Sequence, residues 1–310
     1  METTGVEERG RPSGAEQHDS DGLREHIHAM WAAVAPGWAE HASYVDARGA
    51  SVTQKMLELS APRPREHVLE LACGPGSVGL AAAARVGPGG EVVLSDVVPE
   101  MTSIAGARAQ GLGLSNVRTC VLDLERIDQP DSAYDVVLCR EGLMFASDPG
   151  RAAREIHRVL RPGGRAALAV WGPRQHNPWL AIVFDAVSAK LGAPVPPPGV
   201  PGPFSLDDQQ ELVRLLSDAE LSDVVVTELP TPLRARSFEE WWTRTSSLAG
   251  PLASVLASLP DDAARSLRAR LREAVSAYES PTGLEFPGVT LLASGCRASR
   301  ATEMRRSPLQ

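Results

Sequence analysis

The segment VLELACGPGSVGL, residues 68–80, constrains the fold of this 310-residue chain more than any other stretch. A short apolar run typical of a buried strand leads into Gly74, Gly76 and Gly79, and an apolar helical stretch follows. Glycine allows a tight turn here and lets a ligand approach the backbone, where it faces the free N–H groups at the start of the helix. The segment therefore predicts a strand–turn–helix unit with a ligand site at its turn.

Strand-like and helix-like segments alternate after this unit. We expect strands at 68–71, 91–96, 117–124, 134–140 and 165–172, separated by helices at 77–85, 99–110 and 151–160. This rhythm is typical of βαβ units and a parallel sheet. With later strands at 223–229 and 288–296, the predicted fold class is α/β: a doubly wound, mostly parallel seven-stranded sheet with a helical lid.

The segments outside this rhythm suggest how the chain is organised. We expect a disordered polar tail at 1–22 that is no signal peptide, and a helical lid at 23–60 that breaks at Pro36-Gly37. An α/β core at 61–175 is followed by a lid helix and proline-rich loop at 176–204. Residues 205–300 complete the sheet and carry a helical insert at about 237–280, and 301–310 form a tail. Ser205 and Ser237 are the expected helix caps.

Composition and charge exclude several classes of protein. The net charge of −8 argues against binding to a nucleic-acid backbone. No apolar run approaches the roughly 18 residues that span a membrane, so we expect a cytoplasmic protein. Four widely spaced cysteines predict neither a disulfide framework nor a metal site. The sequence is compatible with a homodimer.

The chemistry around the glycines narrows the choice of ligand. A glycine turn and the acid Asp96, which ends the second strand, serve either a dinucleotide such as NAD or another nucleoside ligand. Glu70 discriminates, because a buried acid beside the turn would repel a pyrophosphate, and no basic residue occurs in 68–84. An acid there suits a ligand with an ammonium group. S-adenosylmethionine (SAM) has an ammonium group, a carboxylate and a ribose but no phosphate.

These residues also carry a family resemblance. VLELACGPG resembles motif I of the class I SAM-dependent methyltransferases, and similar later motifs follow in order at 94–96 (LSD), 122–125 (LDLE), 134–145 (YDVVLCREGLMF) and 154–164 (REIHRVLRPGG). Within that superfamily the chain resembles the ubiquinone/menaquinone C-methyltransferases. The resemblance implies a Rossmann-like methyltransferase fold, SAM as cofactor and a small-molecule substrate.

The resemblance also implies which residues hold the cofactor. Glu70 would lie near the ammonium group, Asp96 would bind the ribose hydroxyls, and Asp123 would meet the adenine amino group. The full expected set is Glu70, Ala72, Gly74, Gly76, Asp96, Val97, Met101, Asp123, Leu124, Cys139 and Arg140.

Candidate catalytic groups are few. The Pro-Pro motif that many amine and nucleobase methyltransferases carry after the fourth strand is absent, and Arg140-Glu141-Gly142-Leu143 takes its place. This favours an oxygen or carbon acceptor. Candidate general bases are His176, His41 and Glu141, each with an ordinary structural role as the alternative.

Aromatic and apolar residues in the lid segments predict the acceptor pocket. Trp38, Met144, Phe145, Trp179 and Trp241 are the expected substrate-binding residues, although lid packing explains each one singly. The sequence thus predicts methyl transfer to oxygen or carbon of a small, largely apolar metabolite, such as a natural-product intermediate. The alternatives are a SAM-binding enzyme that catalyses a non-methyl reaction such as cyclisation, a non-catalytic SAM-binding protein, and an NAD-dependent oxidoreductase.

Overall fold

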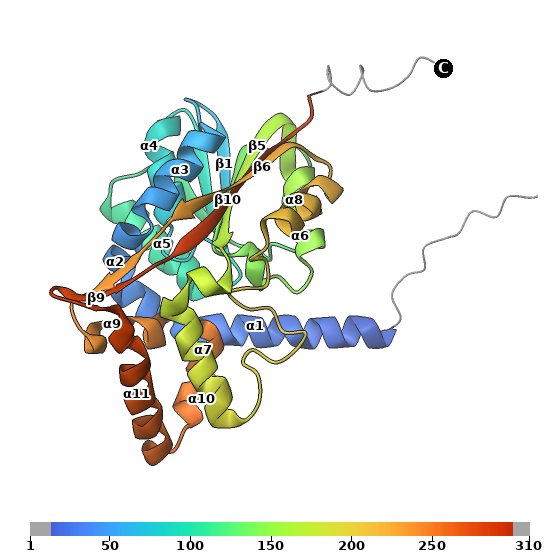
Figure 1. Cartoon of the computed structure of the whole chain (residues 1–310). Coiled ribbons are helices and arrows are strands. Elements are labelled where there is room, and N and C mark those ends of the chain that lie inside the picture. The colour runs from blue at the N-terminus through green and yellow to red at the C-terminus, as the bar shows by residue number, and fades with distance from the viewer. Residues whose placement is uncertain (1–13, 300–310) are drawn as a thin grey trace, which may run out of the picture.

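A seven-stranded sheet forms the centre of the computed structural model, which describes residues 14–299 (Figure 1). The strand order is β3-β2-β1-β4-β5-β10-β6, and only β10 runs antiparallel to its neighbours. This confirms the predicted doubly wound, mostly parallel sheet. The strands are β1 (His67–Leu71), β2 (Glu91–Asp96), β3 (Val117–Val121), β4 (Tyr134–Arg140), β5 (Leu160–Trp171), β6 (Leu221–Pro230) and β10 (Val289–Arg297).

Helices cover both faces of the sheet, which is why the central strands are apolar along their whole length. Residue Val68 of β1 packs into one core cluster and its neighbour Leu69 into the other. The Val68 side is covered by α3 (Ala50–Ser60), α4 (Ser77–Val86) and α5 (Pro99–Gly111). The Leu69 side is covered by α6 (Pro149–Val159) and α8 (Gln209–Asp218).

The remaining helices gather beyond the carboxyl ends of the parallel strands, in the lower half of Figure 1. We call this group the lid: α1 (Gly14–Glu40), α2 (Ala42–Arg48), α7 (Pro178–Leu191), α9 (Phe238–Leu248), α10 (Gly250–Ser258) and α11 (Asp261–Val275). Short 3-10 turns occur at Leu143–Phe145, Arg174–His176 and Ser276–Tyr278. A small sheet of β7 (Leu233–Ala235), β9 (Gly283–Phe286) and β8 (Glu279–Ser280) braces the lid.

The N-terminal lid helix differs from the sequence prediction. It begins at Gly14 rather than 23, so residues 14–22 are helical, and it continues through Pro36 instead of breaking there. Val34 and Ala35, just before the proline, are buried, and α1 packs against α9 and α10. Tertiary packing outweighs the hydrogen bond that Pro36 removes. Residues 1–13 of the tail expected at 1–22, and the whole tail expected at 301–310, lie outside the described residues.

The cap of α8 is also corrected. Asp208, not Ser205, is the capping residue, because its carboxylate accepts a hydrogen bond of 2.8 Å from the backbone N–H of Glu211. The Ser205 hydroxyl instead accepts one from Gly202 in the preceding loop. The predicted cap at Ser237 is confirmed by its contact with the Glu240 N–H.

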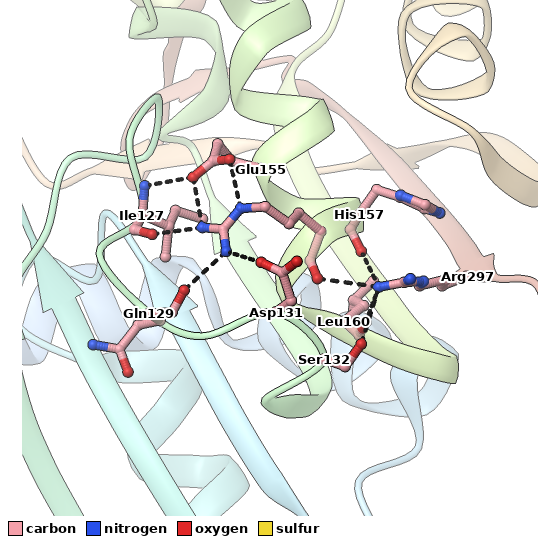
Figure 2. A network of polar contacts seen from close by, with 9 residues as sticks. Ile127, Gln129, Asp131, Ser132, Glu155, His157, Leu160 and Arg297 are labelled. Atoms are coloured by element: carbon pink, nitrogen blue, oxygen red, sulfur yellow. Dashed lines mark hydrogen bonds and ion pairs between the residues drawn. The ribbon is translucent and has the colours of Figure 1, made fainter.

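An arginine network fastens the sheet edge opposite the lid (Figure 2). Arg297, at the end of antiparallel β10, donates through Nη1 to the carbonyl oxygens of His157, Arg158 and Leu160, where α6 gives way to β5. The Arg158 guanidinium binds Glu155, Asp131 and the carbonyls of Ile127 and Gln129. These contacts order the connections at the amino ends of the strands and leave the opposite edge for a ligand.

Candidate active site

The glycine turn after β1 has the geometry that its sequence predicts. Gly74 and Gly76 have φ values of +50° and +86°, which side-chain-bearing residues rarely adopt. An added Cβ at Gly79 would overlap Leu94 and lie 2.6 Å from Glu70 Oε2. The glycines thus bring the start of α4 directly against β1 and β2.

Glu70 is the buried acid beneath this turn. It is only 2% exposed, and its Oε2 accepts a hydrogen bond of 2.8 Å from the backbone N–H of Gly79 near the start of α4. Burial raises the pKa of the carboxyl group to about 7, although the Gly79 hydrogen bond and the charge of Arg140 oppose that rise. A cationic ligand group beside Glu70 would favour its ionised form.

Asp96 holds the turn from the end of β2. Its two carboxylate oxygens accept hydrogen bonds from the backbone N–H groups of Gly74 at 2.9 Å and Val98 at 3.0 Å. Burial raises its pKa, and these hydrogen bonds oppose the rise. Two acids therefore flank one glycine turn, an environment hostile to a pyrophosphate.

A single cavity at the carboxyl edge of the sheet takes in this turn and the lid. Most expected cofactor residues line it, namely Glu70, Ala72, Gly74, Asp96, Val97, Met101, Asp123, Leu124 and Arg140. Gly76 and Cys139 do not. An added Cβ at Gly76 would meet Leu94 and Ala105, so Gly76 shapes the turn from inside. Cys139 is fully buried, and burial raises the pKa of its thiol to about 12.

Aromatic side chains form part of the cavity wall. Trp38, Met144, Phe145 and Trp179 line it as expected, and Trp31 stands edge-on to Phe145 with ring centroids 4.8 Å apart. Trp241 lies elsewhere: it is 1% exposed, stacks on Phe286, and donates from Nε1 to the Trp179 carbonyl. Trp241 therefore lies behind the wall, outside the cavity lining.

Of the three candidate bases, only Glu141 lines the cavity. It follows β4 with a φ of +59°, a strained value, and no hydrogen bond or ion pair forms at its carboxylate among the described residues. His176 is exposed on a 3-10 turn outside the cavity. His41 precedes α2, also outside the lining, with a buried and unpaired Nε2.

The lining residues that sequence reasoning missed include Tyr44, Arg48, Trp171 and Arg244. Trp171 carried a usable signal, since it ends a predicted parallel strand at the edge where such sheets bind ligands. Tyr44, Arg48 and Arg244 lie on helices whose orientation over the sheet is set by packing, and no local pattern marks them.

The lid is tied to the glycine turn by Asp46 of α2. Its carboxylate accepts a hydrogen bond from Ser77, the first residue of α4, and pairs with Arg108 of α5. Arg108 also donates to the Pro75 carbonyl within the turn. The cofactor side of the cavity therefore takes its shape from the lid as well as the sheet.

Two features are absent from residues 14–299. No helix there is both long and apolar enough to cross a membrane. No group of three or more histidine, cysteine, aspartate or glutamate side chains in that range is placed to hold a metal ion.

Known proteins resemble this chain in sequence and fold. Residues 68–164 match a family model described as a methyltransferase domain. The ubiquinone/menaquinone biosynthesis C-methyltransferase UbiE of Ectopseudomonas mendocina is 38% identical over 133 residues, which are 43% of this chain and 52% of that protein. The chain thus spans about half the length of the curated relatives it matches.

Solved structures agree with the sheet topology. The YcgJ protein of Bacillus subtilis has a TM-score of 0.55 at 21% identity, over 80% of this chain and 98% of that one. The cyclase SpnF has a TM-score of 0.50 at 21% identity, over 80% and 81%. At such identities the likeness concerns the fold. Residues 68–164 are thus similar to a methyltransferase domain and to part of the UbiE C-methyltransferases, and the strand order and the glycine turn with its two buried acids agree with that similarity.

Proposed function

We propose that the chain transfers a methyl group from SAM to an oxygen or carbon of a small, largely apolar metabolite. One observation carries the proposal: a single cavity joins a glycine turn flanked by two buried acids to an aromatic wall. The first half suits a cationic nucleoside ligand without phosphate, and the second suits an apolar acceptor.

The residues of the cofactor half fit SAM. Glu70 would hold the ammonium group, Asp96 the ribose hydroxyls, and Asp123 with Leu124 the adenine. SAM supplies a methyl group on a positively charged sulfur, and its departure needs little chemical help from the protein. The lid then contributes by aligning the acceptor and excluding water, a role for the aromatic wall of Trp31, Trp38 and Phe145.

Glu141 is the group best placed to accept a proton from the acceptor. Glu141 lines the cavity and follows β4, which lies between β1 and β5 in the sheet. His176 and His41 would have to move to reach the same space. The assignment of Glu141 follows from position and from its unpaired carboxylate.

The narrower expectations stay predictions. A natural-product intermediate fits an aromatic cavity, and we keep it as the proposed acceptor class. A cytoplasmic location, a homodimer and the absence of nucleic-acid partners rest on the sequence alone.

Calorimetry with SAM and with NAD tests the cofactor assignment. We expect SAM to bind and NAD not to bind; the reverse result would overturn the proposal. Asp96→Ala should weaken SAM binding by about 1–3 kcal/mol, because a buried hydrogen-bond partner is lost.

Asp135→Ala is the matched control for Asp96→Ala. Asp135 also accepts a backbone hydrogen bond, from His67, but at the opposite edge of the sheet. We expect this variant to lose stability while its SAM affinity stays the same. Equal losses of SAM affinity in both variants would show that Asp96 has only a structural role.

Mass spectrometry of candidate acceptors incubated with SAM tests the reaction. The expected result is a gain of one methylene unit in the product with release of S-adenosylhomocysteine. A rearranged product of unchanged mass would instead favour a cyclisation of the kind that the name of SpnF implies for that protein.

A further inference from the structure

Arg48 occupies an unusual position in the cavity. It is the last residue of α2, and its guanidinium lies over the rings of Trp171 and Trp179, 4.6 Å and 4.2 Å from their centroids. All three residues line the cavity. The two indoles stand edge to face, 5.2 Å apart, so they fix the plane of the guanidinium.

Two donor nitrogens of Arg48 have no hydrogen-bond partner in the part of the chain that the structure describes. Its Nε and Nη2 are withdrawn from solvent and make no hydrogen bond with any described residue. These two nitrogens share one edge of the planar group and present two parallel N–H bonds. Leaving a charged donor buried without an acceptor costs free energy. An acceptor on a bound ligand would offset this cost at the Nε–Nη2 edge, where the described residues supply none.

The other arginines of the cavity have partners. Arg140 donates to Thr53 at 3.0 Å, Arg244 pairs with Glu240 at 2.8 Å, and Arg24 pairs with Glu125 at 3.0 Å. Glu141, the unpaired carboxylate of the same lining, forms no ion pair with Arg48. Among these four cavity arginines, Arg48 is the one with two buried donors on the same edge that have no acceptor among the described residues.

We infer that Arg48 binds a carboxylate carried by the methyl acceptor. The inference rests on the proposed function, and it narrows the acceptor from an apolar molecule to an apolar acid. A carboxylate has two coplanar oxygens that match the two N–H groups of the Nε–Nη2 edge. The flanking indoles keep water away and leave room for an apolar body beside the charge.

The sheet order places Arg48 on the acceptor side. The acids expected to hold the cofactor lie on β1 and β2, whereas Trp171 ends β5, with β4 between them. A carboxylate on Arg48 would therefore lie beyond Glu141, away from Glu70 and Asp96, which would repel it. The body of the acceptor would then extend from Arg48 back toward the methyl group.

Binding of matched acids and amides tests this inference. The probes are benzoate, 2-naphthoate and decanoate, each paired with its primary amide, and their affinities are measured by calorimetry at pH 7.5, with and without S-adenosylhomocysteine. We expect at least one acid to bind at least tenfold more tightly than its amide. Arg48→Met should remove that preference by weakening the acid and leaving the amide within threefold.

Two variants separate a binding role from a structural one. Arg48→Lys keeps the positive charge but not the two parallel N–H donors, so it should show only part of the preference for the acid over its amide. Arg272→Met removes the same charge from a lid arginine outside the cavity lining, and should keep the preference. The inference is overturned if no acid binds more tightly than its amide, or if Arg48→Met keeps the preference. Either outcome leaves SAM binding, and so the proposed function, separately measurable.

Discussion

Glu70 shows how one side chain decides the ligand class. The sequence places an acid four residues before the first glycine, and the structure places its carboxylate against the Gly79 N–H, inside the cavity lining. Burial gives this group a pKa of about 7. Its charge is therefore adjustable near neutral pH, and two measurable consequences of opposite sign follow.

The first consequence is for stability. The folded-state pKa lies above the ordinary value of 4.5, so the folded protein holds the proton more tightly than the unfolded chain. The stabilisation is present below about pH 4.5 and is lost as pH rises through 7. Relative to Glu70→Gln, which keeps the acceptor for Gly79, the wild type should lose about 3 kcal/mol of unfolding free energy between pH 4.5 and 8. Urea unfolding at several pH values measures this, and a pH-independent difference would contradict the assignment.

The second consequence is for cofactor binding. An ammonium group favours ionised Glu70, so SAM affinity should rise with pH between 5.5 and 7, by up to tenfold per pH unit. Glu70→Gln should bind SAM more weakly and lose this slope. Calorimetry on both proteins across this range measures it; a slope shared by both would assign the titration to another group.

Secondary elements were predicted best where local pattern and burial agree. The strands 91–96 and 134–140 match β2 and β4 at both ends, because a continuous apolar run bounded by turn residues leaves few alternatives. Helix α1 did not follow its local signals. The helix continues through Pro36 because it packs against α9 and α10, which come about two hundred residues later in the chain.

A substitution at Gly37 tests how tightly α1 packs against α9. An added Cβ there would overlap the carbonyl oxygen of Ser247, whereas one at Gly22 of the same helix would meet nothing within 4 Å. Gly37→Ala should therefore cost about 1–3 kcal/mol of stability by overpacking. Gly22→Ala should be neutral or slightly stabilising. Thermal unfolding compares the two, and equal melting temperatures would mean that the contact between α1 and α9 adapts freely.

For the whole molecule, the cavity is shared between the sheet and the lid. Its cofactor end is built by β1 and β2 but is also covered by Trp38 of α1, and Asp46 of α2 fastens the lid to the glycine turn. A bound cofactor would therefore be expected to order both parts at once.

Hydrogen exchange followed by mass spectrometry tests this coupling. S-adenosylhomocysteine should slow exchange several-fold in peptides from 24–48 and 238–250 as well as in 70–80. Peptides from 149–159, at α6 on the sheet, should stay unchanged. Slowing confined to 70–80 would show that the lid closes independently of the cofactor.

The sequence by itself determined the sheet, the glycine turn and most of the cofactor lining, because these depend on buried strands and on residues adjacent in the chain. Only the tertiary structure decided which of the expected acceptor residues meet in the cavity and which others join them. Three residues from separate segments meet there, namely Arg48, Trp171 and Trp179. Trp241 and His176 lie outside the cavity because of how their own segments pack. A local sequence pattern indicates which face of a helix is apolar. It does not indicate which side chain from a distant part of the sequence will pack against that face.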